Sequence, residues 1–512
     1  MRQRPHQEQP RPSPGAAVSG RLTGNETVLL IALCLVALLL RLRVGIDGNN
    51  LIHPDETFDY LEQGFRLAFG YGTQVWTYED GVRSYVFPGL LAAVMKLGAL
   101  FGPRPAAPLN AVAVFMSLLS LSIVVTAFLW GRRVAGTLGA AITGSIAAVW
   151  FELIYFAPHA LSEVIATDFL VVATYLCPDW ASAPASKWRW RWLGICLGLT
   201  FVFRIQLAPA ILVIGLWLLA RQGWRVALHV SVFAAIPVIA TGMLDWATYS
   251  YPFQSFILNF WANTFGGVAS HYGTEPFYYL IDLEIHYQTG LFALVILACV
   301  VAGMRLPLVL AIAASICVAH SLIGHKEYRF IYPALPFIFV LAGVATSQLV
   351  QAIGSQAPGS AQAGLAVLLI ALWSFASWAQ GMEGPFRREW LRSSGMLAAA
   401  RFIAARPDVC GIGYYNSPDA PAGMVHLNHN VPMIGDTTPE QFERDFRSFN
   451  VVIAADDKLP PGDAFTLDRC WENGFNEASY NRRMPHVCVL TRPAQCEPGA
   501  VGQPDPNRPR GW

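Results

Sequence analysis

Long apolar runs separated by short polar loops recur between residues 27 and 378, and they constrain the fold more than any other feature. Crossing a bilayer takes about 20 predominantly apolar residues, and several runs reach this length. The chain is 54% hydrophobic and only 13% charged, and its 16 Trp and 17 Tyr suit a protein with extensive membrane interfaces. We therefore predict a mostly α-helical, polytopic membrane protein with about 11–12 transmembrane helices. The runs are Thr27–Val44, Val86–Phe101, Ala107–Trp130, Val134–Phe151, Ala160–Cys177, Trp192–Phe203, Leu207–Ala220, Val226–Leu244, Gly290–Ala302, Leu308–Ile323, Phe330–Val350 and Leu365–Trp378.

The positions of Lys and Arg predict which side of the membrane each loop faces. Residues 1–24 are rich in Pro, Gln and Arg, and we expect them to be disordered and cytoplasmic. The first apolar run lacks a small-residue cleavage site, so it is interpreted as a retained span rather than a signal peptide. The basic loops are all cytoplasmic only if Val86–Phe101 does not fully cross. The outer face then holds residues 45–106, 152–159, 245–289 and 324–329, Arg204, and everything after about residue 380.

The last part of the chain, residues 381–512, has the pattern of a small α/β domain rather than of membrane helices. Short apolar segments at Cys410–Tyr415, Phe449–Ala455 and His486–Leu490 predict buried strands. Together with the topology they divide the chain into a transmembrane domain over 25–380 and an extracytoplasmic α/β domain. Because this domain is expected on the oxidising side of the membrane, we expect its four cysteines to form two disulfides. Three pairings of the four are possible. The cysteines are Cys410, Cys470, Cys488 and Cys496.

Two adjacent acids, Asp55 and Glu56, follow His53 and Pro54 in the predicted outer loop 45–85. On a helix they would point about 100° apart, so we expect one to face a cavity while the other pairs locally. Inverting sugar transfer needs one carboxylate to take the proton of the acceptor hydroxyl. Both are catalytic candidates, with Asp55 leading. The alternative, equally weighted from spacing alone, is an interfacial helix with both acids at its positive end.

A second charged stretch, His325-Lys326-Glu327-Tyr328-Arg329, lies between two apolar runs. A charge at bilayer depth is costly and usually faces a cavity or a partner. Lys326 and Arg329, together with Arg204 between two short runs, are candidates for holding a phosphate leaving group. Glu327 could orient one of these cations, and His325 could donate a hydrogen bond. The alternative is a short loop whose Lys and Arg side chains extend to the lipid headgroups.

The outer segment 245–289 combines aromatic and amide side chains around Asp245 and Tyr272. This mixture is typical of sugar recognition, and equally of an interfacial aromatic belt. We expect His159 and Glu163, at the start of a later span, to be satisfied helix-end groups. The sequence has no CxxC spacing for a metal, no phosphate-binding GxxxxGK[ST] loop, and a net charge of only +1. We therefore expect no metal, no cofactor and no nucleic-acid partner.

Taken in order, these motifs resemble glycosyltransferase family 22, the polyprenyl-phosphate-mannose-dependent mannosyltransferases of the C-type superfamily. The resemblance covers roughly residues 27–350 and implies an inverting transferase that uses a lipid-phosphate sugar on the outer face, with Asp55 as the leading base. The cysteine-bearing tail departs from the eukaryotic members, and the Ala/Arg usage suggests a bacterial inner-membrane protein. The matching stretches are His53–Glu56, Phe69–Gly72 with Trp76, Gly81–Tyr85, Leu161–Glu163, Tyr272–Pro276 and His325–Phe330.

The function expected from these features is transfer of mannose from a polyprenyl-phosphate donor to a lipid- or glycan-linked acceptor. A transporter or flippase for polyprenyl-linked sugars would also have a charged central cavity. However, the sequence shows no inverted repeat, which transporters often have. A scaffold whose spans merely anchor an outer domain is a third class. Convergence of Asp55, Arg204, Lys326 and Arg329 on one outward cavity would favour the enzyme, whereas scattered positions would exclude it.

Overall fold

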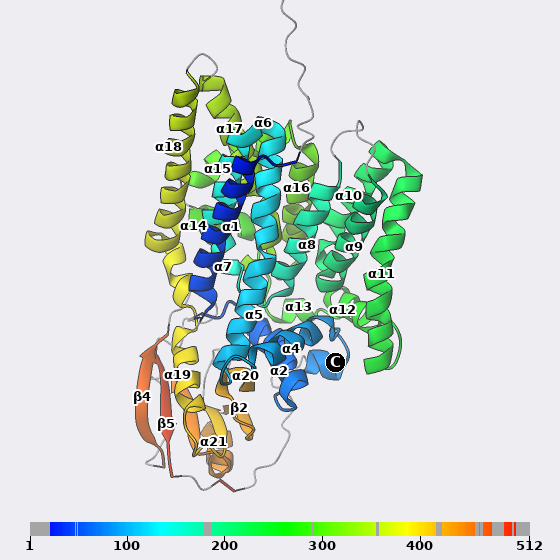
Figure 1. Ribbon diagram of the computed structural model, residues 1–512. Helices are drawn as coiled ribbons and strands as arrows, with labels where there is room; N and C mark the ends of the chain where they lie inside the picture. Colours follow the sequence, from blue (N-terminus) through cyan, green and yellow to red (C-terminus); the bar gives the residue numbers. More distant parts are fainter. Residues whose placement is uncertain are drawn as a thin grey trace, which may run out of the picture.

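The computed structural model places a bundle of helices at one end of the molecule and a small sheet domain at the other (Figure 1). It describes residues 21–46, 48, 50–178, 186–288, 290–354, 358–415, 422–437, 439–455, 460, 464–473, 486–493 and 496–497. The predicted disordered N-terminus lies outside the described residues, apart from 21–24. Within them, six helical segments are long and apolar enough to cross a membrane, and one bent pair could be a seventh. The six are Gly24–Gly45, Ala106–Val149, Ile205–Gln222, Trp224–Thr248, Tyr328–Gly354 and Gly359–Glu383, and the bent pair is Tyr279–Gln288 with Leu291–Gly303.

The first membrane helix, α1 (Gly24–Gly45), begins where a capping box satisfies its free backbone N–H groups. Thr23 accepts a hydrogen bond from the backbone N–H of Glu26, and the Glu26 carboxylate accepts one from the N–H of Thr23. The same carboxylate lies 2.9 Å from Arg132 in α6 (Leu121–Val149). This end of α1 is thereby joined to the basic loop that the sequence places in the cytoplasm.

Close backbone approach allows the helices on one side of the bundle to pack tightly. In α9 (Lys187–Phe203), Gly194 and Gly198 lie one turn apart and face α11 (Trp224–Thr248). A Cβ atom at these positions would lie 2.4 Å from the Val230 carbonyl oxygen and 2.2 Å from that of Ala234. Small residues at such a contact permit the van der Waals packing that drives helix association in lipid.

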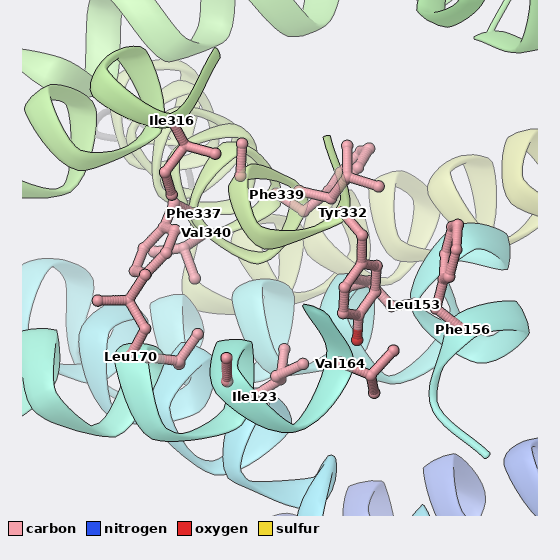
Figure 2. Close-up of a cluster of buried hydrophobic side chains, with 14 of the residues drawn as sticks. Ile123, Leu153, Phe156, Val164, Leu170, Ile316, Tyr332, Phe337, Phe339 and Val340 are labelled. Atoms are coloured by element: carbon pink, nitrogen blue, oxygen red, sulfur yellow. The ribbon is translucent and has the colours of Figure 1, made fainter. Parts of the chain in front are cut away.

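A continuous apolar core holds two groups of helices in the bundle together (Figure 2). It lies where α6, α7 (Phe151–Phe156) and α8 (Ser162–Leu176) meet α16 (Pro307–Leu322) and α17 (Leu335–Gly354). Because the charged stretch 325–329 connects α16 to α17, this core fixes the position of those charges. Residues in it include Ile123, Leu153, Phe156, Val164, Leu170, Ile316, Tyr332, Phe337, Phe339 and Val340.

The outer loop is largely helical. The apolar helix that follows it is too short to cross the membrane. A π-helical turn, η1 (Glu56–Leu61), continues into α2 (Glu62–Phe69), which ends at Gly70 in the left-handed conformation with φ 85°. After a short turn at α3 (Trp76–Glu79), α4 (Val86–Gly98) has only 13 residues. Such a helix is about 20 Å long, less than the roughly 30 Å of a hydrocarbon core. Its length agrees with a segment that does not fully cross.

The sheet domain has five strands in the order β2-β1-β3-β5-β4. The three predicted strands are confirmed, whereas β2 and β4 had no clear signal in the sequence. All described β4 side chains are at least partly exposed, so it lacks the apolar pattern by which strands are recognised. β1 pairs in parallel with β2 and β3, while β5 is antiparallel to β3 and β4. The strands are β1 (Ile412–Tyr415), β2 (Met433–Thr437), β3 (Val451–Ala455), β4 (Thr466–Glu472) and β5 (His486–Thr491), with α19 (Ser394–Ala404) and α21 (Pro439–Asp445) beside them.

All four cysteines expected to pair lie in disulfides. Cys410 is bonded to Cys496, and Cys470 to Cys488, which selects one of the three possible pairings. The second bond links neighbouring strands β4 and β5. Among the described residues, the five cysteines of the membrane half are not in disulfides.

The sheet domain is attached to the outer loop through the buried carboxylate of Glu62. One oxygen accepts a 2.7 Å hydrogen bond from the N–H of Thr73, and the other accepts a 2.8 Å bond from the N–H of Val425 in α20 (Met424–Leu427). The Tyr71 hydroxyl adds a 3.2 Å bond to Asn428. Glu62 thus joins the helix that follows Asp55 to the C-terminal domain.

The stability of this junction is expected to depend on pH. Burial raises the pKa of Glu62 to about 7, although the N–H groups of Thr73 and Val425 oppose the shift. The folded state therefore binds this proton more tightly than the unfolded state, so stability is lost as pH rises from 4.5 to about 7, by about 3 kcal/mol. Glu62→Gln cannot titrate and should lack this contribution. Thermal unfolding of both proteins at pH 5 and pH 8 measures it, and equal shifts in Tm would contradict the assignment.

Candidate active site

The outer loop presents the Asp55 carboxylate to two arginines that are distant in sequence. Oδ2 of Asp55 lies 2.9 Å from Nη2 of Arg329 and 3.2 Å from Nη2 of Arg83. Oδ1 lies 3.2 Å from Nδ1 of His53, which also accepts the backbone N–H of Asp55. Asp55 is therefore fixed at the start of η1 by side chains from three segments of the chain.

Electrostatics keep the Asp55 carboxylate ionised. Burial alone would raise the pKa of Asp55, but the charges of Arg329 and His53 hold it well below its usual range. The neighbouring Asp59 behaves in the opposite way, because burial raises its pKa to about 6 despite a 2.9 Å contact with Arg83. Asp59 also accepts a 2.7 Å hydrogen bond from Thr77. Two nearby carboxylates thus have separated pKa values, a common feature of sites that move protons.

Glu56 points away from Asp55 and is enclosed by hydrogen bonds. Its Oε1 lies 2.7 Å from Nδ1 of His159 and accepts the N–H of Ala160, while Oε2 accepts the N–H of Ile52. The residue is 3% exposed. Glu56 is therefore in a local pair with His159, whereas Asp55 faces the arginines.

Arg329 is the centre of the charged cluster. Besides Asp55, its Nε lies 2.5 Å from Oε2 of Glu327, and its Nη1 lies 3.4 Å from Oε1 of Glu163. Glu327 in turn contacts His325 at 2.7 Å and His53 at 3.2 Å. The contacts of Arg329, which is 4% exposed, do not fit a side chain that extends to the lipid headgroups.

Arg204 reaches the same cluster from the break between two short helices. It lies between α9 and the turn η2 (Ile205–Leu207), where the backbone is extended. Its Nη2 is 3.1 Å from Glu163, and its guanidinium lies over the Phe330 ring at 5.1 Å. Asp55, Arg204 and Arg329, three of the four residues whose convergence the enzyme hypothesis requires, therefore lie in one cluster.

Lys326 does not join this cluster, which corrects the expectation that it faces the same side as Arg329. Its ammonium group donates hydrogen bonds to the carbonyls of Glu275 at 2.8 Å, Ile323 at 2.5 Å and Gly324 at 3.5 Å. These bonds match the three donors of an ammonium group. Two of the carbonyls follow the C-terminal end of α16, where a cation is favourable. Lys326 therefore holds the loop rather than facing the arginines.

The outer segment contributes less than expected. Asp245, fully buried at the end of α11, accepts hydrogen bonds from the N–H and hydroxyl of Ser255, which begins α12 (Gln254–Thr264). It therefore joins two helices rather than the charged cluster. Tyr272 is 42% exposed and lies beside His325, with 6.3 Å between ring centroids. Of Asp245 and Tyr272, it is therefore Tyr272 that lies beside the site.

Three residues of the cluster were not among the predicted site residues: Arg83, Asp59 and Glu163. Arg83 contacts both Asp55 and Asp59, and its Nη1 donates a 2.6 Å hydrogen bond to Tyr60. Both Arg83 and Glu163 lie in stretches that resembled the family, so these stretches were the available signal. Among the described residues, no group of three or more His, Cys, Asp or Glu side chains is arranged to hold a metal ion.

Fold and charged cluster together define a membrane-embedded glycosyltransferase with the C-type fold. A solved structure of ArnT from Cupriavidus metallidurans bound to undecaprenyl phosphate aligns with a TM-score of 0.62 at 15% identity. The alignment covers 92% of this chain and 98% of ArnT. At this identity the likeness establishes the fold alone.

The Alg9-like mannosyltransferase family model matches residues 30–386, and the chain belongs to that family. GPI mannosyltransferase 3 of Yarrowia lipolytica is 25% identical over 429 residues, or 78% of this chain and 77% of that protein. GPI alpha-1,2-mannosyltransferase 3 of Bos taurus is 24% identical over 320 residues, or 58% of this chain and 55% of that protein. The match thus spans only a little over half of the bovine protein. The resemblance drawn from the motifs is confirmed.

Proposed function

We propose that this enzyme transfers mannose from a polyprenyl-phosphate-linked donor to a lipid- or glycan-linked acceptor, with inversion at the anomeric carbon. Membership of a mannosyltransferase family supports the sugar. The relatives are GPI mannosyltransferases, which supports a lipid-linked acceptor. The undecaprenyl phosphate bound to ArnT, which has the same fold, supports a polyprenyl-phosphate donor.

Asp55 is the proposed general base. As the acceptor hydroxyl oxygen attacks the anomeric carbon, the carboxylate takes the hydroxyl proton, and the bond from that carbon to the phosphate oxygen breaks. The phosphate leaves with the bonding electron pair. One observation carries the assignment: the Asp55 side chain is 24% exposed, against 4% for Glu56, 9% for Asp59 and 1% for Glu163. Asp55 is thus ionised and the most accessible of these acids.

Arg329 and Arg204 are the proposed ligands of the donor phosphate. Guanidinium groups bind phosphate oxygens through paired N–H donors, and both side chains are buried where such bonds are strong. Because Arg329 also touches Asp55, a phosphate on Arg329 would lie next to the base. Glu327 orients Arg329, and His53, His325 and Tyr272 border this site. Lys326 acts on the loop, and Asp245 positions α12, so neither is now proposed as a ligand.

We infer that the reaction takes place on the outer face of a bacterial cytoplasmic membrane. The positive-inside rule supports a cytoplasmic N-terminus, and the two disulfides support an oxidising compartment for the C-terminal domain. In this arrangement residues 25–380 form the transferase, while 381–512 cover its outer side through Glu62 and α20.

Reconstituted transfer tests the proposal directly. The full chain in vesicles is given polyprenyl-phosphate mannose labelled in the sugar, together with glycolipids extracted from the source membrane, and products are read by mass spectrometry. Polyprenyl-phosphate glucose is the matched donor control. Mannose on a new lipid or glycan supports the proposal. Movement of intact donor across the vesicle membrane without transfer would instead identify a flippase.

A further inference from the structure

Glu163 bridges the two arginines that are proposed to bind the donor phosphate. Its Oε1 lies 3.1 Å from Nη2 of Arg204 and 3.4 Å from Nη1 of Arg329. The Glu163 side chain is 1% exposed, and Glu163 is the second residue of α8. One carboxylate oxygen therefore occupies the space between two guanidinium groups contributed by other segments of the chain.

The bridge leaves several N–H groups unused. Among the described residues, Nε of Arg204 and Nη1 of Arg329 have no hydrogen-bond acceptor, and Oε1 of Glu163 has no donor in hydrogen-bond geometry. Buried polar groups are nearly always paired, and each exception asks for a cause. The two arginines that share this oxygen thus each keep an unused donor, which indicates a place built for an anion with more oxygens than the one Glu163 offers.

The charges of the cluster point the same way. Three guanidinium groups, from Arg83, Arg204 and Arg329, face four carboxylates, from Asp55, Asp59, Glu163 and Glu327. Each of these guanidinium groups already faces at least one carboxylate, so a phosphate that approaches them meets like charges, which repel strongly in a buried site. Binding therefore requires one carboxylate to give up its arginine contacts.

Glu163 is the carboxylate that is least held by other groups. Asp55 also contacts Arg83 and His53, and Glu327 also contacts His53 and His325. Asp59 is held by Thr77. Apart from the arginines, Glu163 accepts only a 3.0 Å hydrogen bond, on Oε2, from its neighbour Ser162 among the described residues.

We propose that Glu163 is an internal competitor of the lipid phosphate for Arg204 and Arg329. In the absence of donor, the Glu163 carboxylate binds both guanidinium groups. It releases them when the donor phosphate binds, and it binds them again after transfer, which displaces the polyprenyl phosphate. Glu163 is a positioning residue, because it acts through the arginines. The inference rests on the proposed function, since it assumes a polyprenyl-phosphate donor at these arginines.

Binding of undecaprenyl monophosphate to the full chain in nanodiscs tests this role without requiring transfer. Glu163→Gln removes the competing charge and should bind the lipid phosphate about tenfold more tightly, as expected for about 1.4 kcal/mol. Glu152→Gln changes another buried carboxyl group, one that is bound by Trp150 and Gln288 rather than by these arginines, and serves as the control. It should leave affinity unchanged. In the transfer assay, Glu163→Gln should lower kcat and strengthen product inhibition, which a merely structural role would not do.

Equal or weaker binding by Glu163→Gln would overturn the inference while leaving the proposed function intact. If this variant fails to fold, Glu163→Asp provides the same test. Its shorter side chain keeps the charge but retracts from the arginines, so it should also bind more tightly than wild type. Absence of undecaprenyl phosphate binding by wild type would overturn both this inference and the proposed donor class.

Discussion

Asp55→Asn is expected to lower the rate of mannose transfer by about 100- to 10,000-fold, the usual effect of losing a general base. The amide keeps the size of the side chain but cannot take the proton from the acceptor hydroxyl. Transfer rates per folded enzyme, normalised by tryptophan fluorescence, provide the measurement. If the variant keeps more than about a tenth of the wild-type rate, the base lies elsewhere.

Glu56→Gln is the matched control for this measurement. Glu56 neighbours Asp55 but accepts backbone N–H groups from Ile52 and Ala160 and pairs with His159. The amide retains one acceptor oxygen, so the change should reduce thermal stability more than the rate per folded enzyme. A larger loss of rate than in Asp55→Asn would reverse the roles of the two acids.

Arg329→Lys is expected to raise the donor KM by about tenfold or more, although the substitution looks conservative. A lysine keeps the charge but loses the planar set of N–H donors that reaches a phosphate and three carboxylates together. Hydrogen bonds to charged groups each contribute about 1.5–3 kcal/mol, so losing one accounts for this effect. Steady-state kinetics at saturating acceptor measure the change.

Lys326→Ala separates this account from one in which any cation of the loop binds phosphate. Its ammonium group bonds to three carbonyls, so its loss should lower Tm while the donor KM changes by less than about threefold. A donor KM raised as much as in Arg329→Lys would place Lys326 on the phosphate. An unchanged KM in Arg329→Lys would favour the headgroup alternative for the charged stretch.

Much of the architecture could be predicted because it depends on local patterns. Apolar runs identify membrane helices, the 16-residue run at Val86–Phe101 is too short to cross with ease, and apolar segments mark β1, β3 and β5. The exposed strand β4 has no such pattern. Its place in the sheet follows from its pairing with β5, and a local sequence pattern does not predict this pairing.

The site was predictable as a set of residues but not as a geometry. Asp55 and Arg329 are 274 residues apart, and the ordered motifs alone suggested that they meet. Which way each side chain points depends on contacts that only the fold creates. Glu56 turned inward because His159 approaches it, and Lys326 turned away because carbonyls that follow α16 accept its hydrogen bonds. Neither partner could be read from spacing.

The anomeric configuration of the transferred mannose is the most direct test of the central claim, that Asp55 acts as the single base in a direct displacement from a lipid phosphate. The product formed by the reconstituted enzyme is isolated, and the one-bond carbon–hydrogen coupling at the anomeric position is compared with that of the donor. The account predicts inversion. Retention would require a covalent intermediate or two displacements, and would contradict it.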